Sequence, residues 1–293
     1  MLKLFTSIIK FFIYSNFFVA LCVTAFTHLT YLIYSLPTSN LPVVLLMVFS
    51  FTFFTYNGQR LFRLRQKILQ PEDIGERLKW VIKNKTMLTI FSALFGIIGL
   101  VCTCFINPYC FFILIPMGGL SVFYVIPLIP FYKKSPSLRD IPYLKIIVIA
   151  ITWSIAIVRL PFIDSKFIYQ NINSTSFVLA LFQVFLFVIA ITLPFDVRDI
   201  KFDKLNHLKT IPQLIGSKST IIFSELFLIC SIVLLYNLLP ARNYFYALFI
   251  SHLITMTIIA FTNEKRKEVF FAGLVEGTVI ILYSSVLISD LFF

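Results

Sequence analysis

The sequence lacks any polar stretch long enough to form a soluble domain. Of its 293 residues, 59% are hydrophobic, and the mean hydropathy is +0.93, whereas soluble domains are about 45–50% apolar. Apolar runs of about 20 residues recur along nearly the whole chain, and this is the length at which a helix crosses a bilayer. We therefore predict an all-α fold, a polytopic membrane helical bundle that forms a single transmembrane domain over residues 1–293.

Cysteine is scarce and follows no metal-binding pattern. The five cysteines are Cys22, Cys102, Cys104, Cys110 and Cys230, and all lie in or next to apolar runs. Cys102 and Cys104 lack the two-residue gap of common zinc knuckles, and no second pair follows them. We expect these side chains to pack as small apolar groups within the bundle.

About nine membrane spans are expected from the apolar runs. They cover residues 11–35, 41–58, 86–106, 109–129, 143–163, 175–195, 218–239, 243–262 and 269–291. The first run is too long for the apolar region of a cleavable signal peptide. Polar loops on the inner side then cover residues 59–85, 130–142 and 196–217.

Basic residues dominate the charge, with 25 Lys and Arg against 13 Asp and Glu and a net charge of +12. All of them except Arg159, Lys166 and Arg242 fall in the N-terminal tail and in alternate loops of this topology. The positive-inside rule then predicts a cytoplasmic N-terminus, and we expect an integral protein of a bacterial inner membrane. The basic charge indicates topology and contact with anionic lipid in the bilayer, and no nucleic acid is expected as a partner.

Three carboxylates follow the sixth apolar run. On a helix, Asp199 lies about 300° and Asp203 about 340° around from Asp196, so all three project from one face. Like charges at this spacing repel, and a cation between them removes the repulsion. Oxygen ligands of this kind suit Mg²⁺, which is typically held by one or two carboxylates, water and substrate phosphate. The spacing therefore indicates a site for Mg²⁺ and phosphate.

Other charged residues accompany these aspartates. Four basic side chains in or just after loop 130–142 share their membrane face: Lys133, Lys134, Arg139 and Lys145. They form either a phosphate clamp or a topology anchor. Glu276 lies inside the last apolar run, where a carboxylate is costly, so we expect it to face the bundle interior in a structural or a functional role.

Two segments resemble the UbiA-type membrane prenyltransferase family. The run Asp196-Val197-Arg198-Asp199-Ile200-Lys201-Phe202-Asp203, followed by Lys209-Thr210-Ile211-Pro212 and Gly216, resembles the second aspartate-rich motif of that family. The run Ile129-Pro130-Phe131-Tyr132-Lys133-Lys134 through Leu144-Lys145 resembles the family's segment between the fourth and fifth helices. Nine spans with the polar loops inside also match.

The resemblance implies a UbiA-prenyltransferase-like bundle with a lateral opening to lipid. Such proteins transfer a prenyl group from a polyprenyl diphosphate to an aromatic or lipid acceptor, and two aspartate motifs hold the diphosphate through Mg²⁺. Carried over to this chain, Asp199 and Asp203 are the expected metal ligands. Asp196 is expected to be an auxiliary ligand or to orient a lysine, and all three are the expected catalytic carboxylates.

The sequence departs from the family at the first motif, where an Asn-Asp-x-x-x-Asp-like run is expected after the second span. Asn57 keeps the asparagine position, but the carboxylates are gone and Arg60, Arg63 and Arg65 stand nearby. Arginine binds phosphate oxygens directly. The expected diphosphate-binding residues are therefore Asn57, Arg60, Arg63, Lys133, Lys134, Arg139, Lys145 and Lys209.

Three functions are compatible with these residues. The first is a divergent, Mg²⁺-dependent prenyltransferase in which arginines cover part of the phosphate charge. The second is a non-catalytic relative that binds an isoprenoid or an anionic lipid, and the lost first motif motivates it. The third is a small-solute transporter, although paired Gly- or Pro-interrupted helices at mid-membrane are missing.

Overall fold

The computed structural model describes residues 2–66, 75–127, 137–166, 174–205, 208–239 and 242–292. Over these residues the chain is helical and contains no strand. The α-helices are α1 (Leu2–Tyr14), α2 (Phe17–Ile33), α3 (Leu41–Gln66), α4 (Glu76–Lys83), α5 (Lys85–Thr103), α6 (Phe111–Phe123), α7 (Leu144–Ser154), α8 (Leu160–Asp164), α9 (Ser174–Leu205), α10 (Ile211–Ile215), α11 (Ser217–Leu238), α12 (Arg242–Ala260) and α13 (Glu276–Phe292). Short 3-10 turns, η2 (Pro108–Cys110) and η3 (Leu138–Asp140), precede α6 and α7, and π-helical turns, η4 (Ile155–Arg159) and η6 (Phe270–Val275), precede α8 and α13.

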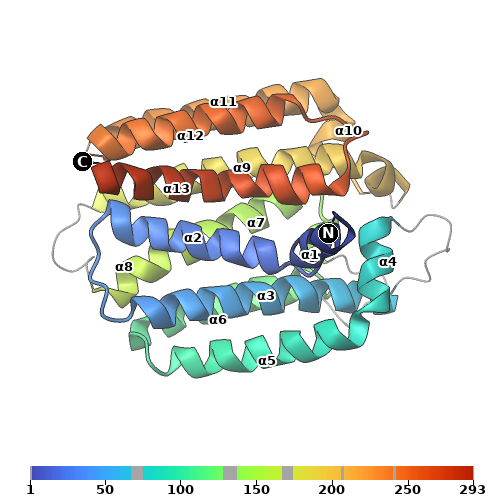
Figure 1. The fold of residues 1–293 in the computed structure, drawn as a ribbon, viewed down its shortest axis with the longest axis horizontal. Helices are drawn as coiled ribbons and strands as arrows, with labels where there is room; N and C mark the ends of the chain where they lie inside the picture. The colour runs from blue at the N-terminus through green and yellow to red at the C-terminus, as the bar shows by residue number, and fades with distance from the viewer. Residues whose placement is uncertain are drawn as a thin grey trace.

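The long helices run along the longest axis of the molecule and pack into one bundle (Figure 1). Helix α9 packs against α7 and α11, α3 packs against α2 and α5, and α13 packs against α2 and α12. The two chain ends lie toward opposite ends of the long axis (Figure 1).

Seven helices among the described residues are long and apolar enough to span a membrane, and the bent pair α1–α2 makes an eighth if it counts as one span. The run expected to span residues 109–129 is shorter than predicted, because its helix covers only 108–123 with its 3-10 turn. Helix α6 contains Pro116, and 13 residues rise only about 20 Å, against the roughly 30 Å of a bilayer core. The all-helical membrane fold is thus confirmed, while nine is an approximate count.

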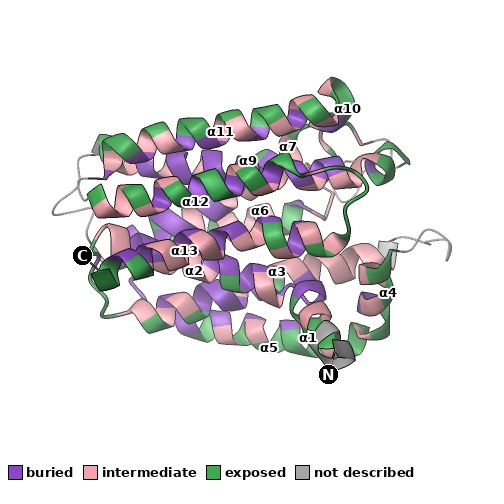
Figure 2. Ribbon diagram, turned by 45° about the horizontal axis from the view of Figure 1, so that its top comes forward, coloured by how far each residue is buried: buried purple, intermediate pink, exposed green. Residues whose placement is uncertain are grey.

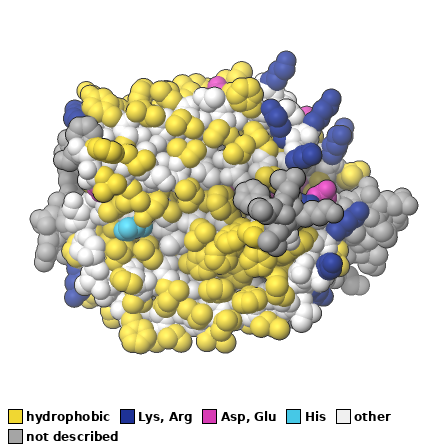
Figure 3. Space-filling model, viewed as in Figure 1, with side chains coloured by type: hydrophobic (Ala, Val, Ile, Leu, Met, Phe, Trp, Pro, Cys, Tyr) yellow, Lys and Arg dark blue, Asp and Glu magenta, His cyan; other side chains and the backbone are white. Residues whose placement is uncertain are grey.

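Burial follows the pattern of a bundle in lipid. Buried residues lie where the helices face one another, and exposed residues lie on the outward faces (Figure 2). The outward faces carry large apolar side chains, among them Ile90, Phe112 and Leu274. Lys and Arg gather at the right-hand end of the view in Figure 3, beyond the apolar surface. The surface therefore has an apolar belt and a basic end.

Two glycines allow α5 to pack closely on α3. A Cβ atom added at Gly96 would lie 2.9 Å from Phe54 Cδ2, and one added at Gly99 would lie 2.8 Å from Phe51 Cδ1. Small residues at such contacts let membrane helices approach, since dispersion contacts dominate their association. These contacts hold the aromatic side chains of α3 in place beside the cavity described below.

A buried polar contact fixes the break between α1 and α2, which bend by 65°. Asn16 adopts a left-handed conformation at the break, with φ 61°, and its Nδ2 donates to Asn57 Oδ1 at 2.8 Å. Asn57 Nδ2 donates in turn to the carbonyls of Ser15 and Phe53, at 2.9 and 3.0 Å. Asn57 is fully buried, so it joins α3 to the α1–α2 break.

We expect Asn57→Leu to destabilise the bundle by roughly 1–3 kcal/mol, because it leaves buried polar partners unsatisfied. Thermal unfolding in a neutral detergent measures the effect, which should be a fall of a few degrees. Asn237→Leu is the matched control, since Asn237 is exposed and its amide donates only to the Val233 carbonyl of its own helix. Equal melting temperatures for the two variants would contradict this role.

Candidate active site

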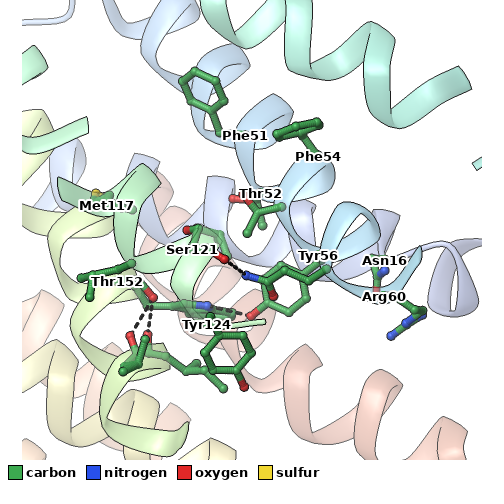
Figure 4. Close-up of a pocket in the computed structure, with 18 of the residues that line it drawn as sticks. Asn16, Phe51, Thr52, Phe54, Tyr56, Arg60, Met117, Ser121, Tyr124 and Thr152 are labelled. Carbon is green, nitrogen blue, oxygen red and sulfur yellow. Dashed lines mark hydrogen bonds between the residues drawn. The ribbon is translucent and has the colours of Figure 1, made fainter. Parts of the chain in front are cut away.

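One large cavity, of about 840 Å³, opens inside the bundle. Residues from α2, α3, α4, α5, α6, α7, α8, α9 and α13 line it. Figure 4 shows part of this lining, with Phe51, Phe54 and Tyr56 on α3, Met117 on α6, and Arg60 further along α3. The cavity is large enough for a drug-sized apolar ligand.

Charged side chains occupy part of this lining, and they come from segments far apart in the sequence. Six are cationic, and we call them the basic cluster: Arg60, Arg63, Arg77, Arg139, Lys145 and Arg198. Three are acidic: Asp199, Glu268 and Glu276. The C-terminal parts of α3 and α9 thus face one shared cavity through Arg60 and Asp199.

Arg198 is the centre of an ion-pair network. Its guanidinium donates to both oxygens of Asp199, at 2.8 and 3.0 Å, and to Glu268 Oε2 at 2.9 Å. The other Glu268 oxygen accepts a short hydrogen bond from Arg77. The Arg198 guanidinium also lies over the rings of Phe195 and Phe271, with centroid distances of 5.0 and 5.5 Å. Such a fork-shaped, stacked geometry fixes both the arginine and the carboxylates.

The α1–α2 break positions two further arginines. Arg77 Nη2 donates to Asn16 Oδ1 at 2.8 Å and to the Ile13 carbonyl at 3.3 Å. Arg60 Nη1 donates to the Tyr14 carbonyl at 2.9 Å. Arg77 is therefore held by a backbone carbonyl, an amide oxygen and its ion pair with Glu268, whereas Arg60 is held by a backbone carbonyl.

Arg63 and Arg139 approach the cavity from different elements. Arg139 lies in η3, which the Ser137–Asp140 hydrogen bonds cap, and its backbone N–H donates to the Tyr124 carbonyl at the end of α6. Within the described part of the chain, no carboxylate lies within ion-pair distance of Arg60, Arg63 or Arg139. These three guanidinium groups are consequently available to an anion.

The three aspartates do not face one space. Asp199 lines the large cavity, whereas Asp196 and Asp203 line a small pocket of about 10 Å³ beside it, with Lys209 and Thr210. Asp196 accepts a hydrogen bond of 2.6 Å from Lys145 Nζ, which is the contact that orienting a lysine requires. Asp203 is 1% exposed, and neither of its carboxylate oxygens has a hydrogen-bond partner among the described residues.

Polar groups also reach the apolar part of the cavity. Trp153 Nε1 donates to the Tyr56 hydroxyl at 3.0 Å, and Gln59 Nε2 donates to the Ser121 carbonyl at 3.0 Å. Glu276 lines the cavity from α13, so it faces the bundle interior as expected. The lining is thus mainly apolar and aromatic, with a few fixed polar groups.

The predicted diphosphate residues divide into three groups. Arg60, Arg63, Arg139 and Lys145 line the large cavity. Asn57 is engaged in the α1–α2 contact and Lys209 lines the small pocket. Lys133 and Lys134 lie outside the described residues.

Sequence reasoning did not single out Arg77 or Glu268, which line the cavity and pair with each other. Both lie in connections between apolar runs and follow no motif. The one available signal was the rarity of acidic residues, which makes an isolated glutamate beside a span worth examining.

Burial raises the pKa of the Glu268 carboxyl, but the charges of Arg198 and Arg77 outweigh this effect and hold the pKa below its ordinary value. Glu268 precedes the last span. Its carboxylate is therefore charged at neutral pH and links the two arginines.

Comparison with known proteins gives one consistent result. The sequence pattern of the UbiA prenyltransferase family matches residues 81–272. A UbiA homologue from Archaeoglobus fulgidus bound to GPP and Mg²⁺ is similar in structure, with a TM-score of 0.68 at 13% identity, over 96% of this chain and 99% of that one. An apo UbiA homologue from Aeropyrum pernix K1 has a TM-score of 0.64 at 13% identity, over 96% and 98% of the chains. No curated protein matches the sequence.

Ionised Glu268 stabilises the fold above its lowered pKa, and this contribution is lost as the pH falls through that value. We expect the melting temperature of Glu268→Gln in detergent to lie below that of the unsubstituted protein at pH 7. The difference should shrink once the pH falls below about 4.3, the ordinary value for Glu. Glu264→Gln, at an exposed position of the same connection, is the control. A difference that stays constant from neutral to acidic pH would contradict the network.

Proposed function

We infer the function from one premise: this chain belongs to the UbiA prenyltransferase family. We propose that it binds a polyprenyl diphosphate in its large cavity and transfers the prenyl group to an acceptor within the membrane. Relatives of the same fold are bound to GPP with Mg²⁺ and to DMAPP with Mg²⁺. The acceptor class is aromatic or lipid by resemblance.

The single observation that carries the proposal is the composition of the cavity. One wall is apolar and aromatic, and the same space contains the basic cluster. An amphiphile with an apolar chain and an anionic head fits both features at once. A neutral apolar ligand would leave the cationic groups without counter-charge, which is costly in a sheltered site.

The donor set bears on the expected Mg²⁺. In the part of the chain that the structure describes, no three His, Cys, Asp or Glu side chains are grouped to hold a metal ion. Mg²⁺ is often held by one carboxylate with water and substrate phosphate, and two aspartates meet this lower requirement. Asp199 lines the cavity, and Asp203 has buried oxygens that lack a partner. We propose these two as the ligands of Mg²⁺, which when bound would stabilise charge on the departing diphosphate.

The chain's own residues supply the rest of the chemistry. Guanidinium groups of the basic cluster hold the diphosphate as the allylic carbon–oxygen bond breaks and its electron pair passes to the leaving oxygen. Ring faces in the cavity, such as that of Phe54, stabilise the positive charge that develops on the allylic carbon. The acceptor then forms a bond to that carbon and loses a proton. The apolar lining excludes water, which would otherwise compete with the acceptor.

One observation favours the second candidate, a non-catalytic isoprenoid-binding relative. Arg198 already donates to both oxygens of Asp199, so only the remaining lone pairs of that carboxylate are open to a metal. If no metal binds there, the protein would bind a prenyl diphosphate without cleaving its carbon–oxygen bond. Binding together with the absence of turnover would identify this function.

We expect purified protein in lipid nanodiscs to release diphosphate from labelled geranylgeranyl diphosphate with Mg²⁺ and a membrane lipid extract as the acceptor source. Asp199→Asn should lower the rate by on the order of 10²-fold, because a charge that positions the reacting head group is lost. Asp203→Asn tests the second proposed ligand in the same assay.

Asp290→Asn is the matched control, since Asp290 is exposed near the C-terminus and accepts a hydrogen bond from Tyr244. It should keep full activity. Equal release by the unsubstituted protein and Asp199→Asn would exclude the proposed site.

A further inference from the structure

We propose that Arg60, Arg63 and Arg139 bind the diphosphate head group directly, so that binding does not require a divalent cation. This inference rests on the proposed function and concerns how the same site holds its substrate. It follows from which charges in the cavity are already paired.

The charges of the cavity sort into paired and unpaired groups. Lys145 pairs with Asp196 behind the cavity wall. Arg198 pairs with Asp199 and Glu268, and Arg77 pairs with Glu268. Arg60, Arg63 and Arg139 remain, since none of them has an ion-pair partner within the described ranges. Among the described residues, Glu276 is the carboxylate of this cavity that also has no ion pair. Three unpaired guanidinium groups therefore stand against one unpaired carboxylate, and positive charge is in excess.

These three groups line the same cavity. Arg63 and Arg139 are electrostatic neighbours, although they come from α3 and from η3. Arg60 precedes Arg63 by three residues on α3, which places both on one face of the helix. The repulsion between Arg63 and Arg139 is relieved when an anion lies beside them.

The anchors of these groups reduce the cost of ordering them. Arg60 is held by the Tyr14 carbonyl, and the capped turn η3 fixes the backbone of Arg139 to the end of α6. The buried Nε of Arg139 has no hydrogen-bond partner in the described structure. A guanidinium fork matches phosphate oxygens bidentately, and two linked phosphate groups offer enough oxygens for three such forks.

The pairing of the cavity's aspartate also supports direct binding of phosphate by arginine. Asp199 is the only member of the aspartate trio on this cavity, and Arg198 donates to both of its oxygens. At the opposite wall the first aspartate motif is replaced by Arg60 and Arg63. The α3 part of the cavity lining, where metal-binding carboxylates are expected by resemblance, therefore has positive charge of its own.

The ligand chemistry is a phosphate ester on an apolar chain. A prenyl diphosphate and an anionic phospholipid both satisfy this description. The larger charge of the diphosphate matches three guanidinium groups better than a phosphodiester does. Competition by phosphatidylglycerol therefore distinguishes the two sources.

Isothermal titration of the purified full-length protein in neutral detergent tests the inference. The probe is geranylgeranyl diphosphate, titrated once in excess EDTA and once in Mg²⁺. We expect Kd values within threefold of each other, and no displacement by an equal concentration of phosphatidylglycerol. Binding only in Mg²⁺, or equal binding of phosphatidylglycerol, would overturn the inference while the proposed function stands. Absence of binding in both buffers would overturn the proposed function as well.

Substitutions then test whether the three arginines contact the diphosphate head group. Arg60→Gln, Arg63→Gln and Arg139→Gln should each weaken binding in EDTA about tenfold or more, because a charge-assisted hydrogen bond is lost. Arg63→Lys keeps the charge without the fork and should fall between. Arg266→Gln is the matched control, since Arg266 is exposed outside the cavity. If the three variants bind as tightly as this control, the arginines do not hold the head group.

Discussion

Arg198 is the side chain on which the arrangement of the site depends. It joins Asp199 on its own helix to Glu268 before the last span, and Glu268 joins Arg77 on α4. Charges sheltered from water are stable only when they are paired and hydrogen-bonded. This network therefore connects α4, α9 and the start of the last span, and it decides which charges remain free. The anion binding that we propose depends on which cations this pairing leaves without a partner.

The membrane setting explains why so few charges define the site. The chain has only 13 acidic residues, and three of those at the site are paired with nearby cations. Asp196 pairs with Lys145. Asp199 pairs with Arg198, and Glu268 pairs with Arg77. Because the carboxylates of the first aspartate motif are absent and Arg60 and Arg63 stand nearby, arginines outnumber carboxylates in this part of the site. Under our proposal, arginine side chains of this protein take over part of the phosphate binding that the resemblance assigns to metal ions.

The sequence was sufficient for the fold class, because apolar runs are local patterns. It also assigned Arg60, Arg63 and Asp199 to one site, and the three line one cavity. Helical spacing placed Asp196, Asp199 and Asp203 on one face, but an arc of a sixth of a turn still spans two neighbouring pockets. Asn57 joins α3 to the α1–α2 bend, and no sequence pattern near Asn16 predicts that bend. Glu268 belongs to a connection without a motif, so only the tertiary structure shows its partners.

The central claim is that the guanidinium groups of Arg60, Arg63 and Arg139 hold the diphosphate directly, so that its binding does not depend on a metal at Asp199 and Asp203. An experimental structure with bound geranylgeranyl diphosphate, grown with Mn²⁺ in place of Mg²⁺, tests it most directly, since the anomalous signal locates the metal. We predict both phosphate groups between Arg60, Arg63 and Arg139, with the prenyl chain along the apolar wall. A metal peak between Asp199 and Asp203 that carries both phosphates, with the three arginines out of contact, would contradict the account.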